Sequence, residues 1–148
     1  MLSNYETKIE KFKEMEVSAF AYELIKEVLI PDLLGSEYPS MMYWAGKNIA
    51  RKFPLDSWND IPAFFQEAGW GNLVLVEAKK NRIEFTLDGP LVSNRLKHQK
   101  EPNFQLEAGF IAEQIQMLNN NIAESYEQIK KRTDKVELTV KWDLKDRV

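Results

Sequence analysis

Near its end the chain reads Val136-Glu137-Leu138-Thr139-Val140-Lys141-Trp142, and this stretch decides the fold class. Apolar and polar side chains alternate along it, which is the pattern of a strand with one face buried and the other in solvent. Residues 123–131 precede it across the polar turn Arg132-Thr133-Asp134-Lys135. We therefore expect the two segments to pair as an antiparallel hairpin.

A second pair of strands is predicted upstream. Leu73–Val76 is an apolar run rich in β-branched residues, and residues 83–87 alternate between apolar and polar side chains. The polar stretch Lys79–Arg82 between them is typical of a hairpin loop, and Asp88–Pro90 ends the pair. Strands joined by such short turns favour an antiparallel sheet of two hairpins over a parallel sheet.

Helical spacing dominates the rest of the chain. Residues 17–30 repeat apolar side chains at i, i+3 and i+4, which predicts an amphipathic core helix that ends before Pro31. Residues 5–15 predict a short, mostly exposed helix within a possible N-terminal helical arm, residues 1–15. Three more helices are predicted, each ended by a proline, a glycine or a run of asparagines: residues 39–53, 57–68 and 104–118.

These elements predict the class α+β, with four or five helices packed on an antiparallel sheet of two hairpins. A length of 148 residues fits one domain with a core of its own, and the sequence contains no internal repeat and no low-complexity linker. We therefore expect a single domain that spans residues 1–148.

Two of the predicted helices carry further information. In helix 39–53 the core stripe is expected at Met42, Ala45, Ile49 and Phe53, and Gly46 lies in mid-helix, where glycine costs about 1 kcal/mol relative to alanine. Gly46 therefore indicates that another element approaches closely. Helix 104–118 is apolar on two sides, which is typical of a central helix or of one shared with a partner chain. If it is shared, Phe110→Glu should release monomers.

The predicted helix of residues 57–68 has two candidate N-caps. Ser57 or Asp60 could cap it, and Pro62, which fits best near a first turn, favours Asp60. Gly69 after Ala68 is a strong stop signal, since glycine adopts the left-handed conformation without penalty. Gly69–Gly71 lacks the lysine of a phosphate-binding loop, and we expect Trp70 to anchor this helix to the sheet.

Composition excludes most site chemistry. The chain has no cysteine and one histidine, so thiol nucleophiles, thiolate zinc sites, iron–sulfur clusters and disulfides are ruled out. No carboxylates form a recognisable catalytic pair. We therefore expect no enzyme activity, no catalytic or metal-binding residue and no cofactor.

Charge and hydropathy limit the partners and the location. Acidic residues outnumber basic ones, 23 to 20, which argues against a nucleic-acid partner. No apolar run approaches the roughly 18 residues that a membrane span requires. With no signal peptide in the sequence, the expected location is the cytoplasm.

A basic segment, expected to be a polar loop, precedes the last predicted helix. Its amides and side chains form a candidate anion-binding loop, because a helix N-terminus favours negative charge. The alternatives are a solvated loop and, for the histidine, an exposed side chain or a haem ligand. The candidate residues are Arg95, Lys97, His98 and Lys100.

Aromatic residues are more numerous on the predicted helices than simple packing seams require. They could fill the core, form a dimer interface or line an apolar pocket, and the sequence leaves the three open. The candidate pocket or interface consists of Tyr43, Trp44, Gly46, Phe64, Trp70 and Phe110.

Several strings carry a resemblance to a known family. They are residues 21–25 (AYELI), 41–47 (MMYWAGK), 64–71 (FFQEAGWG), 93–102 (SNRLKHQKEP) and 105–113 (QLEAGFIAE). Together they resemble the YslB-like family of uncharacterised Firmicute proteins, over nearly the whole chain. The resemblance implies the TRAPP-like ligand-binding fold of the superfamily that holds the vinyl-reductase-type domains, the TRAPP subunits and the haem-nitric-oxide-binding domains.

The resemblance also implies a ligand-binding or assembly domain that is often dimeric. Relatives that hold an acyl chain do so on a cysteine, which this chain lacks, and the Tyr-x-Ser-x-Arg motif of haem-binding relatives is absent. The expected function is a non-enzymatic regulatory or scaffold domain that dimerises through its helices. The alternative is a sensor or carrier of an apolar small molecule, and a separate protein partner is a further possibility.

Overall fold

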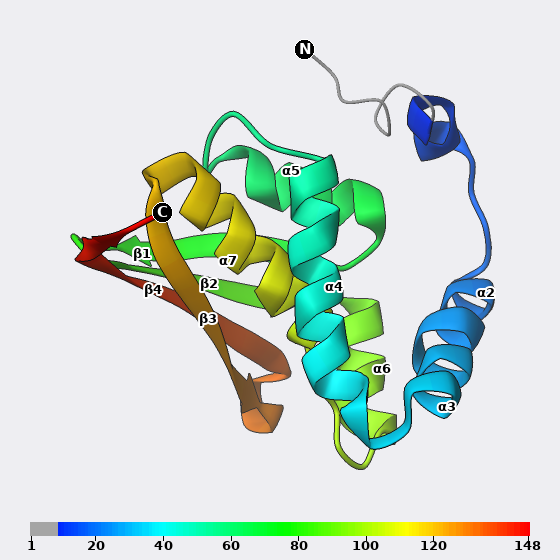
Figure 1. The fold of residues 1–148 in the computed structure, drawn as a ribbon. Coiled ribbons are helices and arrows are strands. Elements are labelled where there is room, and N and C mark those ends of the chain that lie inside the picture. The colour runs from blue at the N-terminus through cyan, green and yellow to red at the C-terminus, as the bar shows by residue number, and fades with distance from the viewer. Residues whose placement is uncertain (1–8) are drawn as a thin grey trace.

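The predicted hairpins join into one antiparallel sheet. The computed structural model describes residues 9–148, and its four strands follow the order β1-β2-β4-β3 (Figure 1). Both hairpins are confirmed, and β2 pairs with β4 to join them, with Phe85 opposite Leu138. The strands are β1 Asn72–Ala78, β2 Arg82–Asp88, β3 Asn121–Lys130 and β4 Lys135–Arg147.

One face of the sheet forms much of the core. Side chains in the middle of β2 and β4 alternate between buried and partly exposed, as the sequence pattern requires. Strand β1 differs, because Val74 and Val76 are about half exposed and only Leu73 is buried. Strand β1 lies at the edge of the sheet, so it has a neighbour on one side only.

This antiparallel sheet, together with the helices that cover it, confirms the α+β class.

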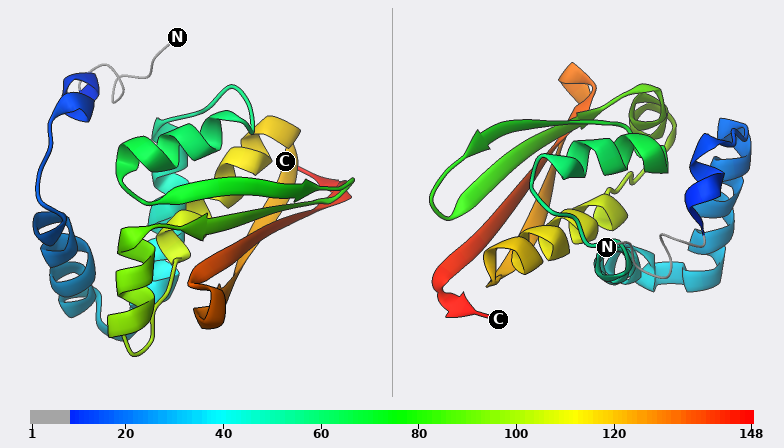
Figure 2. Two further views of the ribbon diagram at one scale, coloured as in Figure 1. Left: turned by 180° about the vertical axis from the view of Figure 1, so that it is seen from behind. Right: turned by 90° about the horizontal axis from the view of Figure 1, so that it is seen from above.

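Within residues 9–148, six α-helical segments accompany the sheet. Helix α7 lies between the sheet and α4, and α5 packs against β1 (Figures 1 and 2). The segments are α2 Ala19–Glu23, α3 Ile30–Leu34, α4 Tyr38–Lys52, α5 Asp60–Ala68, α6 Pro90–His98 and α7 Gln105–Asn119. The remaining helical stretches are the 3₁₀ turns η1 Glu10–Glu14, η3 Gly35–Glu37 and η4 Lys131–Thr133, and the π-helical stretch η2 Leu24–Leu29.

Helix α7 is the centre of the molecule. Every residue from Leu106 to Ile115 is buried, so the helix is covered on all sides within one chain. The sequence offered two interpretations of a helix that is apolar on two sides: a central helix, or one shared with a partner chain. The first interpretation is correct. Phe110 has no exposed surface, and a charge at this position would disrupt the core rather than dissociate a dimer.

Helices α4 and α7 cross with their backbones in contact. A Cβ atom built on Gly46 would lie 2.1 Å from the carbonyl oxygen of Leu106, and one built on Gly109 would lie 2.0 Å from that of Tyr43. The close approach predicted at Gly46 is therefore confirmed, and Gly109 supplies the second half of the contact. Sequence patterning alone did not single out Gly109.

The backbone contact also shifts the buried stripe of α4. Its buried residues are Tyr38, Met42, Gly46 and Ala50. The expected stripe was right at Met42, whereas Ala45, Ile49 and Phe53 are only partly buried. A helix that turns its glycine toward its neighbour must present the residues four positions away on the same side.

The end of α5 predicted from the sequence is confirmed, but the predicted N-cap is wrong. Gly69 has φ +74°, in the left-handed region expected of a glycine at the C-cap. Asp60 is the first helical residue, not the N-cap. The N-cap position is Asn59, whose side chain makes no capping hydrogen bond.

The first helical region departs most from the sequence prediction. Elements α2, η2 and α3 run without interruption over residues 19–34, here called the α2–α3 segment, and lie at the periphery away from the sheet (Figure 2). Pro31 does not end it: it is the second residue of α3, which follows directly on the π-helical stretch η2. The expectation of a core helix is wrong, since Phe20 is 70% exposed. Periodicity in the sequence shows that one face of a helix is apolar, but it does not show what covers that face.

Part of the predicted N-terminal arm lies outside the described residues, which begin at residue 9. Within them, Glu10–Glu14 form the short turn η1. Lys13 in this turn makes a 3.0 Å ion pair with Glu67 on α5.

The crossing of α4 and α7 makes a stability prediction. Gly46→Ala places a methyl group against the backbone of α7, which flexible side chains cannot relieve, and should lower the free energy of unfolding by about 1–3 kcal/mol. Urea denaturation monitored by circular dichroism measures this. Lys47→Ala on the next position of α4 is the control and should change stability by about 0.5 kcal/mol or less. Equal stability of Gly46→Ala and the unmodified protein would contradict the tight crossing.

Candidate functional site: an apolar cleft beside a buried ion-pair network

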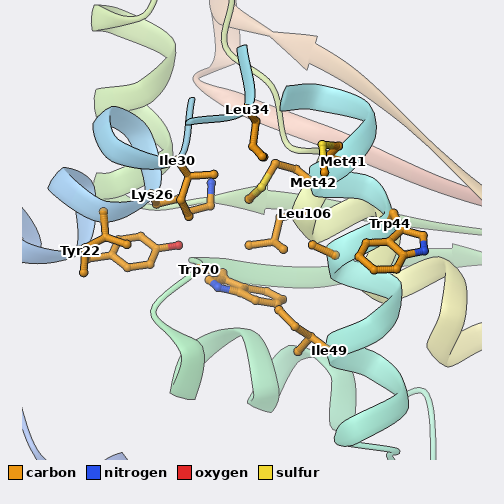
Figure 3. A pocket seen from close by; sticks show the side chains of 12 residues that line it. Tyr22, Lys26, Ile30, Leu34, Met41, Met42, Trp44, Ile49, Trp70 and Leu106 are labelled. Carbon is orange, nitrogen blue, oxygen red and sulfur yellow. The ribbon is translucent and has the colours of Figure 1, made fainter. Parts of the chain in front are cut away.

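A cleft of about 450 Å³ separates the α2–α3 segment from α4 (Figure 3). Its lining is almost wholly aliphatic and aromatic. The segment contributes Tyr22, Ile25, Lys26, Ile30 and Leu34; α4 contributes Met41, Met42, Trp44, Ala45 and Ile49; and Trp70 and Leu106 complete the set.

The cleft has a buried floor and an open rim. Met42, Trp70 and Leu106 are each less than a tenth exposed and belong to the core. At the rim, Trp44 is 60% and Ile25 57% exposed. Exposed apolar side chains that line a concave surface are typical of a binding site.

Tyr22 brings an uncharged polar group to this lining. Its hydroxyl oxygen is buried and, within residues 9–148, makes no hydrogen bond. Figure 3 shows this oxygen directed between the two sides of the cleft, toward Trp70. Burial raises the pKa of Tyr22, and the nearby carboxylate of Glu107 raises it further, so the phenol is neutral at physiological pH.

Behind the cleft, Arg95 on α6 is the centre of a buried ion-pair network. Its Nε lies 3.2 Å from Glu27 Oε1, and its Nη1 lies 3.1 Å from Glu107 Oε2. The same Nη1 donates a hydrogen bond to the carbonyl of Asn103, and the guanidinium lies over the ring of Phe104 at 4.4 Å. Two carboxylates and a carbonyl compensate this buried charge, although Arg95 Nε and Glu107 Oε1 make no hydrogen bond within residues 9–148.

Glu27 connects this network to the α2–α3 segment. It accepts a 2.8 Å bond from Lys26 Nζ and a 2.9 Å bond from Gln99 Nε2. Burial alone would raise the pKa of Glu27, but Lys26 and Arg95 outweigh it and hold the pKa below its usual value. Because Glu27 is on the segment and Arg95 on α6, their ion pair fixes one wall of the cleft to the body of the domain.

The predicted anion-binding loop does not exist as a loop. Arg95 and His98 lie in α6, which ends at His98. Arg95 is turned inward to two carboxylates, while Lys97, His98 and Lys100 are exposed. The four predicted residues are therefore not brought together.

The N-terminus of α7, which follows this segment in the chain, already has a hydrogen-bond partner. The Phe104 N–H ahead of α7 donates a 2.8 Å hydrogen bond to Glu127 of β3. An anion at that end would meet a carboxylate already in place. The helical spacing of Val92 and Leu96, both buried, was the signal that this stretch is a helix.

The predicted aromatic site divides between cleft and core. Trp44 and Trp70 line the cleft. Phe64 stacks on Phe110 with ring centroids 4.4 Å apart, and Trp70 meets Phe110 edge to face at 5.3 Å. Trp70 thus anchors α5 to α7 through these rings.

The remaining two predicted residues have other roles. The Tyr43 hydroxyl accepts a 3.1 Å hydrogen bond from the Ser125 N–H of β3, and Gly46 forms the helix crossing. Sequence reasoning missed Tyr22, Lys26 and Glu107 as site residues. The available signal was Glu107, a carboxylate within a helix that is otherwise apolar on two sides.

Residues 9–148 contain no group of three or more histidine, cysteine, aspartate or glutamate side chains placed to hold a metal ion. None of the helices in this range is long and apolar enough to cross a membrane.

Comparison with known proteins identifies the family. Residues 19–141 match the family described as "Protein of unknown function (DUF2507)". The chain belongs to this family. The "Uncharacterized protein YslB" of Bacillus subtilis (strain 168) is 68% identical over 148 residues, which is the full length of both chains. The resemblance to the YslB-like family is confirmed.

Solved structures share the fold at low sequence identity. A vinyl-4-reductase family protein from Methanocaldococcus jannaschii has a TM-score of 0.69 and 20% identity, covering 90% of this chain and 87% of that one. The phenol-responsive sensory domain of the transcription activator PoxR, solved with phenol, has a TM-score of 0.60 and 10% identity, covering 86% and 76%. An H-NOX protein from K. algicida reaches only 0.36, too low for an argument about sites.

The lowered pKa of Glu27 makes a pH prediction. The ionised form is favoured in the folded chain, so its contribution to stability is present above the ordinary pKa of 4.5 and is lost as the pH falls below it. Glu27→Gln should lower the free energy of unfolding at neutral pH by about 1.5–3 kcal/mol, as expected for a hydrogen bond to a charged group. It should also flatten the fall in stability between neutral pH and about pH 3.

Urea midpoints across this pH range provide the measurement. Glu101→Gln, a change at an exposed carboxylate after α6, is the matched control and should leave the pH profile unchanged. A Glu27→Gln profile that runs parallel to that of the unmodified protein would show that Glu27 does not stabilise the cleft wall through its charge.

Proposed function

We propose that this chain is a non-enzymatic domain of regulation or assembly that binds an apolar small molecule in the cleft between the α2–α3 segment and α4. The observation that carries the proposal is the cleft itself. A volume of about 450 Å³ lies in the range of small-molecule sites, which are mostly apolar with a few polar groups that orient the ligand.

The fold supports the same proposal. The PoxR domain is a sensory domain solved with a small aromatic molecule, phenol, and it shares the architecture of this chain at a TM-score of 0.60. At 10% identity the likeness extends to the fold and not to the residues of a site. The cleft described above provides the site-level argument.

A binding role suits the charged groups beside the cleft better than catalysis does. Lys26 and Arg95 both pair with Glu27, and Arg95 also pairs with Glu107. A general acid or base must be able to reach a substrate and exchange a proton with it. Groups held in buried ion pairs are poorly placed to do so, and we therefore propose no catalytic step.

A second candidate function is self-association, and the exposed surface of the α2–α3 segment favours it. This surface is apolar and continuous along one helical region, whereas monomeric proteins rarely expose large contiguous apolar patches. Its side chains, each 43–73% exposed, are Phe20, Leu24, Ile25, Val28, Leu29 and Leu33. A second copy of the chain is the partner we propose for it, as in the expectation of a helix-mediated homodimer.

The binding proposal predicts that filling the cleft prevents binding. Ala45 lines the cleft from α4, and Ala45→Trp adds an indole to the space a ligand would use. Naphthalene is a suitable apolar probe, with saturation-transfer difference NMR as the measurement. We expect binding to the unmodified protein and at least a 10-fold loss in Ala45→Trp, about 1.4 kcal/mol.

Lys47→Ala is the control, because Lys47 is on the same helix but is not among the residues lining the cleft. It should bind naphthalene as the unmodified protein does. Absence of naphthalene binding to the unmodified protein, or equal binding to Ala45→Trp, would contradict the proposed function.

The self-association proposal predicts that a charge on the exposed segment yields monomers. Light scattering on the unmodified protein should give a mass near twice 17.3 kDa, and Phe20→Glu should give the monomer mass with unchanged circular dichroism. Val74→Glu, at an exposed apolar residue of β1, is the control and should remain dimeric. A monomer mass for the unmodified protein would overturn the proposal.

A further inference from the structure

We propose that the cleft selects uncharged apolar molecules that carry one hydrogen-bonding group, and that the Tyr22 hydroxyl is the residue that recognises this group. The inference rests on the proposed binding function and narrows it to a class of ligand. It adds a specificity-determining residue to a site otherwise defined by shape and hydrophobicity.

The first step is the unmet hydrogen bond of Tyr22. Its hydroxyl is buried and unpartnered within residues 9–148, and Figure 3 shows it directed into the cleft. A buried polar group without a partner costs about 1–3 kcal/mol. A ligand hydroxyl or carbonyl that meets the Tyr22 oxygen would remove this cost, while a purely apolar ligand would leave it in place.

The second step is charge, which disfavours an anionic ligand. Tyr22 lies in the field of three carboxylates, Glu23, Glu27 and Glu107. The cations on this side are Lys26 and Arg95, and the network already uses both, through Glu27 and Glu107. Three carboxylates against two cations leave a net negative charge, which a ligand carboxylate at Tyr22 would meet in a partly buried site.

The third step concerns positively charged ligands. Apart from Lys26 and the Tyr22 hydroxyl, the cleft is lined by apolar side chains such as Ile30 and Leu106 and by Trp70. An ammonium group there would lose its hydration against apolar surface, and Glu27 and Glu107 already have cationic partners. A neutral hydroxyl or carbonyl loses much less on leaving water, so the uncharged class is favoured over both ions.

The test compares four probes that share one ring system: naphthalene, 2-naphthol, 2-naphthoate and 2-naphthylmethylammonium. Affinities are measured by competition in saturation-transfer difference NMR at neutral pH, where 2-naphthol is uncharged. The unmodified protein should bind 2-naphthol most tightly. Tyr22→Phe, which removes only the hydroxyl, should weaken 2-naphthol binding by about 2- to 12-fold, the equivalent of one hydrogen bond.

Two controls establish that the effect is local. Tyr22→Phe should bind naphthalene as tightly as the unmodified protein, because the ring that lines the cleft is retained. Its stability without ligand should be equal or higher, since the removed hydroxyl is unpaired. Tyr126→Phe, at an exposed tyrosine of β3, should bind all four probes as the unmodified protein does.

The outcomes separate the two proposals. If naphthalene and 2-naphthol both bind but Tyr22→Phe leaves their affinity ratio unchanged, the role of Tyr22 is overturned and the binding function stands. Tighter binding of 2-naphthoate or of the ammonium probe than of 2-naphthol overturns the uncharged class. If no probe binds the unmodified protein, the binding function fails and this inference fails with it.

Discussion

The rest of the structure depends on the backbone contact between α4 and α7. Gly46 and Gly109 let the two helices approach so closely that a Cβ atom on either would overlap a carbonyl oxygen of the other. This crossing holds α4 against a central helix that is buried from Leu106 to Ile115 and that packs on the sheet. It also determines which residues of α4 face inward and which, such as Trp44, remain available to line the cleft.

The α2–α3 segment is attached in a different way. Its apolar side chains are largely exposed, and its deepest connection to the domain is ionic, through Glu27 to Arg95. A buried ion pair contributes modestly to net stability but is costly to break from one side, so it favours a single docked position. The cleft therefore has one wall fixed by close helix packing and one wall held by charge.

This arrangement accounts for the function we propose. An apolar cleft with one unpaired phenol and no unengaged charge among the described residues of its lining is suited to binding neutral molecules. Family membership adds no chemistry, because the family and its 68% identical relative are both described as uncharacterised. The likeness to a phenol-responsive sensory domain, at 10% identity, shows the fold alone.

The sequence by itself determined the class, the two hairpins and the helices α4, α5 and α7, because alternation in β2 and β4 and the helical spacing of these three helices are local patterns. It did not determine α6, which was expected as a loop, or the continuation of the first helical region through Pro31. It also signalled the crossing at Gly46. Only the tertiary structure decided where α2–α3 docks, that Arg95 is buried in a helix, and that Tyr22 faces a cleft. These depend on partners far along the chain, such as Glu27 for Arg95. A periodic pattern specifies that a face is apolar or charged, but the contact that covers that face is a property of the folded chain.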